Sequence, residues 1–154
     1  MLKAIKKKMK DQRGLTLVEL LAVIVILGII AAIAVPSVGS IIENSKKDAH
    51  IANAKQMANA ARLAVTNGTI TVPSSGSVNI DLGDLKTGGY IENIKNPSNK
   101  SVNYNDDASL VTITKVTGGY KYRVTLKSGS DASLINHITD DVDASELERT
   151  NVSL

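Results

Sequence analysis

Hydrophobic residues dominate the chain between Leu15 and Val35. These 21 residues read LTLVELLAVIVILGIIAAIAV, and Glu19 is the only charged residue among them. An α-helix of this length spans roughly 32 Å, which is close to the thickness of the hydrocarbon core of a bilayer. Because the segment is apolar on all sides, it differs from an amphipathic surface helix. The pattern predicts a membrane helix.

After Pro36 the pattern becomes amphipathic. Apolar residues recur at three- and four-residue spacing, whereas the opposite face carries charged side chains such as Lys55 and Arg62. The pair Asn67-Gly68 fits a C-terminal helix cap. We therefore expect one helix over residues 15–67, kinked at Pro36, which lacks a backbone N–H. The apolar stripe that should face a core consists of Ile51, Ala54, Ala58, Ala61 and Val65.

Beyond Asn67 the sequence is rich in Thr, Ser, Gly and Asn and contains short runs with high β-propensity. The strongest signal is a hairpin formed by residues 110–116 and 121–127 around Gly118-Gly119. Its expected register pairs Ile113 with Val124 and Val111 with Leu126 on one face. That apolar face should pack on the helix stripe.

These patterns predict an α+β fold, in which a long N-terminal helix packs on a small antiparallel β-sheet. The helix has a membrane half and an amphipathic half. The expected division is a basic segment at 1–14, an apolar helix at 15–36, an amphipathic helix at 37–67 and a β-rich domain at 68–154. The acidic stretch 140–154 shows little periodicity, and no structure is predicted for it.

Charge is distributed unevenly along the chain. Residues 1–14 hold six basic residues and one acidic residue, whereas the remaining 140 residues hold 12 basic and 14 acidic residues. Positive residues directly before an apolar helix favour an N-terminus in the cytoplasm. A domain that binds a polyanion should be basic throughout, and this one is not.

The composition excludes several kinds of chemistry. The chain has no Cys, so it contains no disulfide, no thiolate-bound metal and no thiol nucleophile. Its two histidines, His50 and His137, are far apart in the sequence and leave little for a metal site or a Ser–His triad. We expect His50 to be an exposed residue on the helix. We assign no catalytic residue, no metal and no cofactor.

The residues Gly14–Leu20, GLTLVEL, lie at the junction between the basic segment and the apolar helix. A carboxylate such as Glu19 is costly inside a membrane and usually has a partner or a function. A cut between Gly14 and Leu15 would expose an ammonium group on Leu15. Glu19 of a neighbouring copy could pair with it, because attraction between opposite charges is strong in a medium of low dielectric constant.

This junction resembles the class III signal of type IV prepilins, which pilins and pseudopilins share. The family pattern is a basic leader, Gly, the cleavage site, an N-methylated residue, Thr, Leu, a hydrophobic residue and Glu. Residues 14–19 supply it in order. One departure is Leu15, where Phe is the commonest residue in the family. Gly28 and Pro36 match positions where family helices kink.

The resemblance implies that a prepilin peptidase cuts at Gly14–Leu15 and that Leu15 is methylated. It implies that Glu19 and Leu15 set the register between subunits of a homopolymeric filament. The other implied partners are membrane lipid before assembly, and an assembly platform with its ATPase. The implied location is the cytoplasmic membrane, crossed once with the N-terminus inside, and then a surface filament.

Two other interpretations of the N-terminal region compete with this one. A secretory signal peptide would end at Ala32-Ile33-Ala34, but Glu19 would then lie inside its hydrophobic region. A plain signal anchor explains the helix and leaves the positions of Gly14 and Glu19 unexplained.

Two ligand sites in the C-terminal half are weaker hypotheses. Nucleic acid could bind a basic strand face, but alternation places Tyr120 and Tyr122 on the opposite face, where we expect them to pack. Calcium could bind a group of acidic residues near the C-terminus, but these residues lack the EF-hand spacing. The basic residues are Lys121, Arg123 and Lys127, and the acidic ones are Asp140, Asp141, Asp143 and Glu146.

Among functions we favour a structural subunit of a type IV pilus that serves adhesion and motility. The first alternative is a pseudopilin of a type II secretion or DNA-uptake system. The second is a signal-anchored membrane protein with an extracellular binding domain. None of the three is an enzyme.

Overall fold

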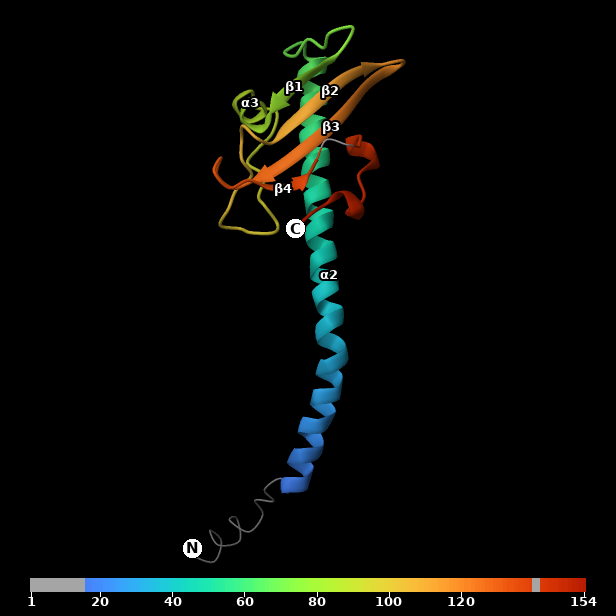
Figure 1. The fold of residues 1–154 in the computed structure, drawn as a ribbon, viewed down its shortest axis with the longest axis vertical. Coiled ribbons are helices and arrows are strands. Elements are labelled where there is room, and N and C mark those ends of the chain that lie inside the picture. Colours follow the sequence, from blue (N-terminus) through green and yellow to red (C-terminus); the bar gives the residue numbers. More distant parts are fainter. Residues whose placement is uncertain (1–15, 140–141) are drawn as a thin grey trace, which may run out of the picture. The chain divides into compact units, whose positions relative to one another are not determined.

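The computed structural model describes residues 16–139 and 142–154. A long N-terminal helix packs on a small four-stranded antiparallel sheet, which confirms the predicted α+β class (Figure 1). The elements in chain order are α2 (Leu17–Thr66), β1 (Ser77–Asp81), α3 (Leu82–Thr87), β2 (Leu110–Val116), β3 (Gly119–Ser128), β4 (Ile135–Ile138) and the 3-10 helices η1 (Ala144–Glu146) and η2 (Arg149–Asn151).

Helix α2 has 50 residues, with Pro36 inside it, and it ends one residue before the end that the sequence predicts. The end is a Schellman motif. Gly68 takes a positive φ of 75°, its N–H donates to the carbonyl of Val65 at 3.0 Å, and the N–H of Thr69 donates to the carbonyl of Ala64 at 3.0 Å. Glycine adopts this left-handed conformation without strain, which is why Asn67-Gly68 stops the helix.

The chain divides into two compact units, residues 1–41 and 42–154. The described residues of the first unit are almost entirely helix. The second unit contains the remainder of α2, the sheet, α3 and the two 3-10 helices. Its sheet order is β1-β2-β3-β4, so each strand pairs with the next along the chain and every pair is antiparallel.

The register of the central hairpin differs from the predicted one by two residues. Val111 pairs with Val124 and Ile113 with Tyr122, so the predicted pairs Ile113–Val124 and Val111–Leu126 are wrong. The reason lies in the turn, because Val116 pairs with Gly119 and the loop is therefore Thr117-Gly118, with Gly118 at a φ of 92°. A shift of two residues keeps every side chain on its predicted face.

The core of the second unit lies between one face of α2 and the sheet. Seven residues of α2 are buried, and five of them are alanine, whose small side chains leave room for the larger residues of the strands. Three of the predicted stripe residues, Ala54, Ala58 and Ala61, are buried, while Ile51 and Val65 are half-buried. The apolar strand residues that are fully buried in this core are Val111, Ile113, Val124, Leu126 and Ile138.

The C-terminal segment, residues 142–154, adds the remaining part of this core. The sequence predicts no structure here, yet Ala144, Leu147 and Val152 are buried. Asp143 starts η1 by accepting a hydrogen bond from the N–H of Ser145 at 2.9 Å. Its other carboxylate oxygen accepts from the N–H of Tyr122 on β3 at 3.0 Å, which ties the segment to the sheet.

Two isoleucines that differ in burial test this description of the core. Ile113→Ala should lower the free energy of unfolding by about 2–5 kcal/mol, since Ile113 is fully buried and the substitution leaves a cavity. Ile135→Ala, at a side chain that is 51% exposed, should cost well under about 1 kcal/mol. Urea unfolding followed by tyrosine fluorescence measures both. Equal losses for the two variants would contradict the assigned core.

Candidate functional site

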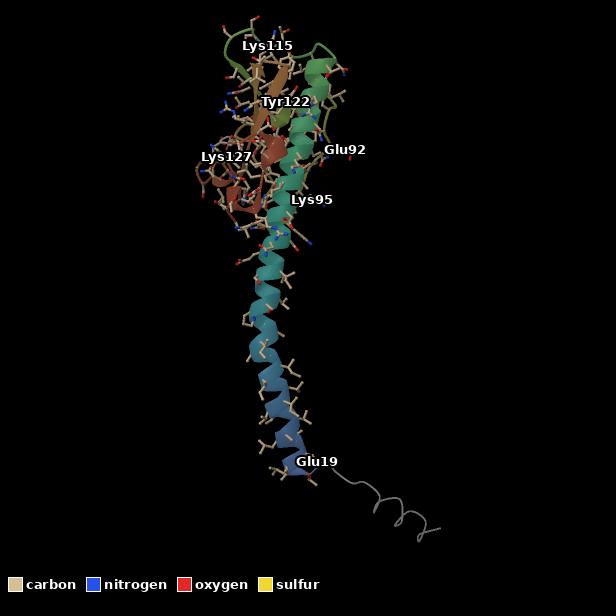
Figure 2. All side chains as sticks on the ribbon, turned by 90° about the vertical axis from the view of Figure 1, so that its right-hand side faces the viewer. Glu19, Glu92, Lys95, Lys115, Tyr122 and Lys127 are labelled. Carbon is tan, nitrogen blue, oxygen red and sulfur yellow. The ribbon has the colours of Figure 1, made fainter. Side chains whose placement is uncertain are left out.

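The first turn of α2 contains a reciprocal capping box between Thr16 and Glu19. The carboxylate oxygen Oε2 of Glu19 accepts hydrogen bonds from the backbone N–H of Thr16 at 2.8 Å and from its hydroxyl at 2.9 Å. In return, the N–H of Glu19 lies 3.2 Å from the Thr16 hydroxyl oxygen, which accepts from it. Figure 2 shows Glu19 at the N-terminal end of α2.

This box gives Glu19 a local role that the sequence argument did not assign to it. The first N–H groups of a helix have no partner within the helix, and a Thr followed three residues later by a Glu satisfies two of them. A carboxylate at this end is also favoured by the helix dipole. The pattern Thr16-x-x-Glu19 is visible in the sequence and could have indicated the cap.

The residues that follow form an apolar surface on which all side chains are exposed. An 18-residue window of α2 has a mean hydropathy of 3.0, and none of it is buried, so this helix is long and apolar enough to cross a membrane. Leu17 is 82% exposed and Ile33 is 71% exposed. A continuous apolar surface of this size indicates contact with lipid or with other protein chains.

Gly28 and Pro36, the predicted kink positions, both lie inside α2. A Cβ atom added at Gly28 would have no neighbour within 4 Å, so packing within the chain does not require glycine at this position. The kinks themselves remain predictions.

Gly14 and Leu15, the predicted cleavage and methylation residues, lie outside the described residues. Of the acidic group considered for calcium, Asp140 and Asp141 also lie outside them. Asp143 is engaged as a helix cap. In the described ranges, no group of three or more His, Cys, Asp and Glu side chains could hold a metal ion.

On strand β3, which carries Lys121, Arg123 and Lys127, one of the two tyrosines is not available to stack on a base of nucleic acid. Tyr122 is only 4% exposed, and the guanidinium of Arg62 lies 4.9 Å from the centre of its ring. The expectation that the tyrosines pack is thus confirmed for Tyr122. Tyr120 is 41% exposed and contacts Tyr122 edge-on at 6.5 Å between ring centres.

The prediction that His50 is exposed is wrong. His50 is fully buried, and its ring stacks on that of His137 with 4.2 Å between the ring centres. The cause is helix periodicity, since His50 lies four residues before Ala54 and so shares the buried face of α2. The same spacing, extended backwards from the apolar stripe, could have indicated its burial.

An open polar cleft of about 740 Å³ lies beside Tyr104. The two charged side chains in its lining, Lys86 and Asp106, pair with each other. Lys86 forms an ion pair with Asp106 at 2.5 Å, and the side-chain amide of Asn105 donates to the carboxylate of Asp131 at 2.9 Å. The cleft therefore offers no unpaired charge that would select a ligand.

Comparison with known proteins gives one match. Residues 9–35 match the family model described as the prokaryotic N-terminal methylation motif, which is the class III signal of type IV prepilins. No curated protein and no solved structure matches the chain significantly.

The motif indicates a protein of the type IV pilin and pseudopilin class. It implies processing by a prepilin peptidase and assembly into pilus-like polymers, and with the apolar helix it points to anchoring in a membrane. Proteins of this class are structural and are not known as enzymes.

Substitution of Thr16 tests the capping box. Thr16→Val keeps the shape of the side chain but removes the hydroxyl, and a helix cap is typically worth about 1 kcal/mol, or about fivefold in an equilibrium constant. Amide hydrogen exchange in the first turn of α2 should therefore speed up about fivefold in detergent micelles. Thr16→Ser retains a hydroxyl and should behave as the wild type. Unchanged exchange in Thr16→Val would show that the box does not hold the turn.

Proposed function

We propose that this chain is the structural subunit of a type IV pilus. A prepilin peptidase cuts it between Gly14 and Leu15, and the new amine of Leu15 is methylated. The mature subunits then bundle through their helices into a surface filament. The observation that carries this proposal is the match of residues 9–35 to the methylation motif. It is supported by the position of Glu19 in the first turn of α2, a helix whose apolar window is not buried by the rest of the chain.

Assembly follows from the exposed apolar surface of α2. In the membrane its Leu, Ile and Val side chains contact lipid, and in a filament they contact the same helix of neighbouring copies. The apolar surface is thereby kept from water at every stage. In this scheme residues 1–14 are a leader, 15–36 form the filament core, 37–67 connect the core to the domain, and 68–154 form the coat.

Glu19 provides the specific contact in this assembly. Its Oε2 already accepts two hydrogen bonds from Thr16, and the second oxygen of a carboxylate can accept more. The ammonium group of Leu15 from a neighbouring copy is the partner that we assign to it. A pairing of this kind fixes the axial stagger between subunits, because a displaced subunit would leave both charges unpaired in an apolar core.

Gly28 and Pro36 allow the helix to kink or unwind locally in the filament. Since packing within the chain does not account for glycine at position 28, we assign it to close packing between subunits or to local unwinding.

The other partners are the assembly platform and its ATPase. The protein would sit in the cytoplasmic membrane with its N-terminus inside and then move to the cell surface.

The identity of the mature N-terminus tests the processing step. Mass spectrometry of filaments sheared from the cell surface should find N-methyl-leucine at position 15 and no peptide from residues 1–14. Gly14→Val should retain those residues, because a branched side chain replaces the glycine that fits an extended peptidase cleft. A mature chain beginning at Val35 would establish ordinary secretion instead.

Long fibres in electron micrographs support a pilus, whereas short ones support the pseudopilin alternative.

The charge of Glu19 is tested separately from its capping role. Glu19→Gln keeps a side chain that can complete a capping box but removes the negative charge. We expect normal cleavage of this variant and loss of at least about nine-tenths of the surface filaments, counted by electron microscopy. Glu43→Gln, an equivalent change at an exposed residue of the same helix, should leave filaments intact. Normal filaments in Glu19→Gln would rule out the ion pair as the register.

A further inference from the structure

The two histidines of the chain form a buried stack at the point where five segments meet. His50 on α2 is fully buried and His137 on β4 is 2% exposed. Their rings are 23° from parallel, and their centres are 4.2 Å apart. Tyr104 contacts both rings edge-on, at 5.8 Å from His50 and 6.2 Å from His137.

All four ring nitrogens have hydrogen-bond partners. His50 pairs through Nδ1 with the Tyr104 hydroxyl at 2.7 Å and through Nε2 with the Ser98 hydroxyl at 2.8 Å. His137 pairs through Nε2 with the Ser128 hydroxyl at 2.8 Å and through Nδ1 with the backbone carbonyl of Ser153 at 3.0 Å. The stack therefore links α2 to β3, β4, the loop around Ser98 and the C-terminal segment.

One hydrogen bond of His137 has a defined direction. A carbonyl oxygen can only accept, so Nδ1 of His137 donates to Ser153, and in the neutral ring Nε2 accepts from the Ser128 hydroxyl. The backbone N–H of Ser153 in turn donates to the carbonyl of His137 at 2.9 Å. Residue 153 is thus held by two hydrogen bonds to a single histidine, which lies directly against a second one.

A positive charge on His50 is disfavoured. Burial, with a smaller contribution from the adjacent His137, lowers the pKa of His50 to about 4. Charged groups of both signs lie on the segments around the stack. They include Lys46, Lys47 and Asp48 on α2, Lys95 and Lys100 beside Ser98, Asp106 and Asp107 beside Tyr104, Lys127 on β3, Asp131 in the loop before β4, and Asp143, Glu146, Glu148 and Arg149 in the C-terminal segment.

Two further anchors hold the C-terminal segment, and both remain charged in weak acid. Arg149 donates two hydrogen bonds to Asp48, at 2.7 and 2.6 Å. This hydrogen bonding is the largest cause that lowers the pKa of the Asp48 carboxyl. Burial alone would raise the pKa of Asp143, but hydrogen bonds from Ser145 and Tyr122 outweigh it and hold that pKa below its usual value. Neither carboxylate takes up a proton until the pH falls below its ordinary pKa of about 4.

We propose that the His50–His137 stack is an acid-sensitive clasp: when uncharged it fastens the C-terminal segment, residues 142–154, to α2 and the sheet, and protonation of the stack releases that segment. The segment covers part of the core through Ala144, Leu147 and Val152. Release would therefore expose apolar surface and one end of the sheet while the β2–β3 hairpin stays folded.

The direction of the pH effect follows from linkage. An unfolded histidine has a pKa of about 6.5, so below this pH the released state binds a proton that the clasped state excludes. The clasp has its full stability above about pH 6.5 and loses it as the pH falls towards 4. The equilibrium constant for release should rise by up to about tenfold for each pH unit in this interval.

Hydrogen exchange on the full chain in detergent micelles tests the clasp. Corrected for the intrinsic pH dependence of exchange, protection of peptides from residues 142–154 should fall on the order of 50-fold between pH 7.5 and 4.5. Peptides from β2 and β3 should keep their protection. The double variant His50→Gln/His137→Gln should abolish this pH dependence. Arg149→Gln, which breaks only the ion pair with Asp48, should loosen the segment equally at all pH values.

A wild-type segment whose protection is constant across this range would overturn the proposal, as would an acid effect that persists in the double variant. If the double variant does not fold, NMR titration of the wild-type imidazole resonances decides instead. Titration of His50 near pH 4 together with loss of the Ser153 amide signal supports the clasp. Titration of His50 near 6.5 while the segment remains protected removes it.

Discussion

An uncovered apolar helix is the constraint on which the rest of this structure depends. Helix α2 has 50 residues, but the residues that it buries begin only at His50. The side chains from Leu17 to Ile42 include most of the exposed large hydrophobic residues of the described chain. Such a surface is stable in water only when something covers it, and lipid and other copies of the same helix are the two covers that assembly of a pilus would use in turn.

Glu19 combines two roles at the beginning of this helix. As a capping residue it accepts a hydrogen bond from the N–H of Thr16, and the Thr16 hydroxyl accepts one from the N–H of Glu19. Two N–H groups that would otherwise face lipid thus have a partner, which matters because each unpaired group is costly there. As a carboxylate in an apolar segment it also needs a positive partner. The capping box meets the first need within one chain. In a single subunit the carboxylate lacks this positive partner, and in the proposed filament the amine of a neighbouring copy supplies it. The capped first turn thus holds the carboxylate ready for that contact.

Local patterns predicted those parts of the fold that local physics determines. The apolar run and the 3.6-residue periodicity gave helix α2 to within a few residues, and Asn67-Gly68 gave its end. Alternation gave the correct faces of β2 and β3, but the register was wrong by two residues because Thr117-Gly118 and Gly118-Gly119 both suit a tight loop. The burial of His50 follows from its place on the buried face of α2, but its contact with His137, which lies 87 residues further along the chain, is encoded by no local pattern. The predicted cleavage and methylation residues, Gly14 and Leu15, rest on the motif alone and stay predictions.

The C-terminal segment shows how a domain without disulfides can close. In the described ranges, residues 142–154 are held by the Asp143 cap, the Arg149–Asp48 ion pair and the histidine stack, with three apolar side chains in the core. Each of these contacts is reversible, whereas a disulfide holds until it is reduced. An exposed ion pair contributes little by itself and is weakened further by salt. The buried contacts must therefore provide most of the attachment, and the histidine stack is the polar part of them. In the proposed clasp, the stability of this attachment consequently depends on whether the buried imidazole of His50 remains uncharged.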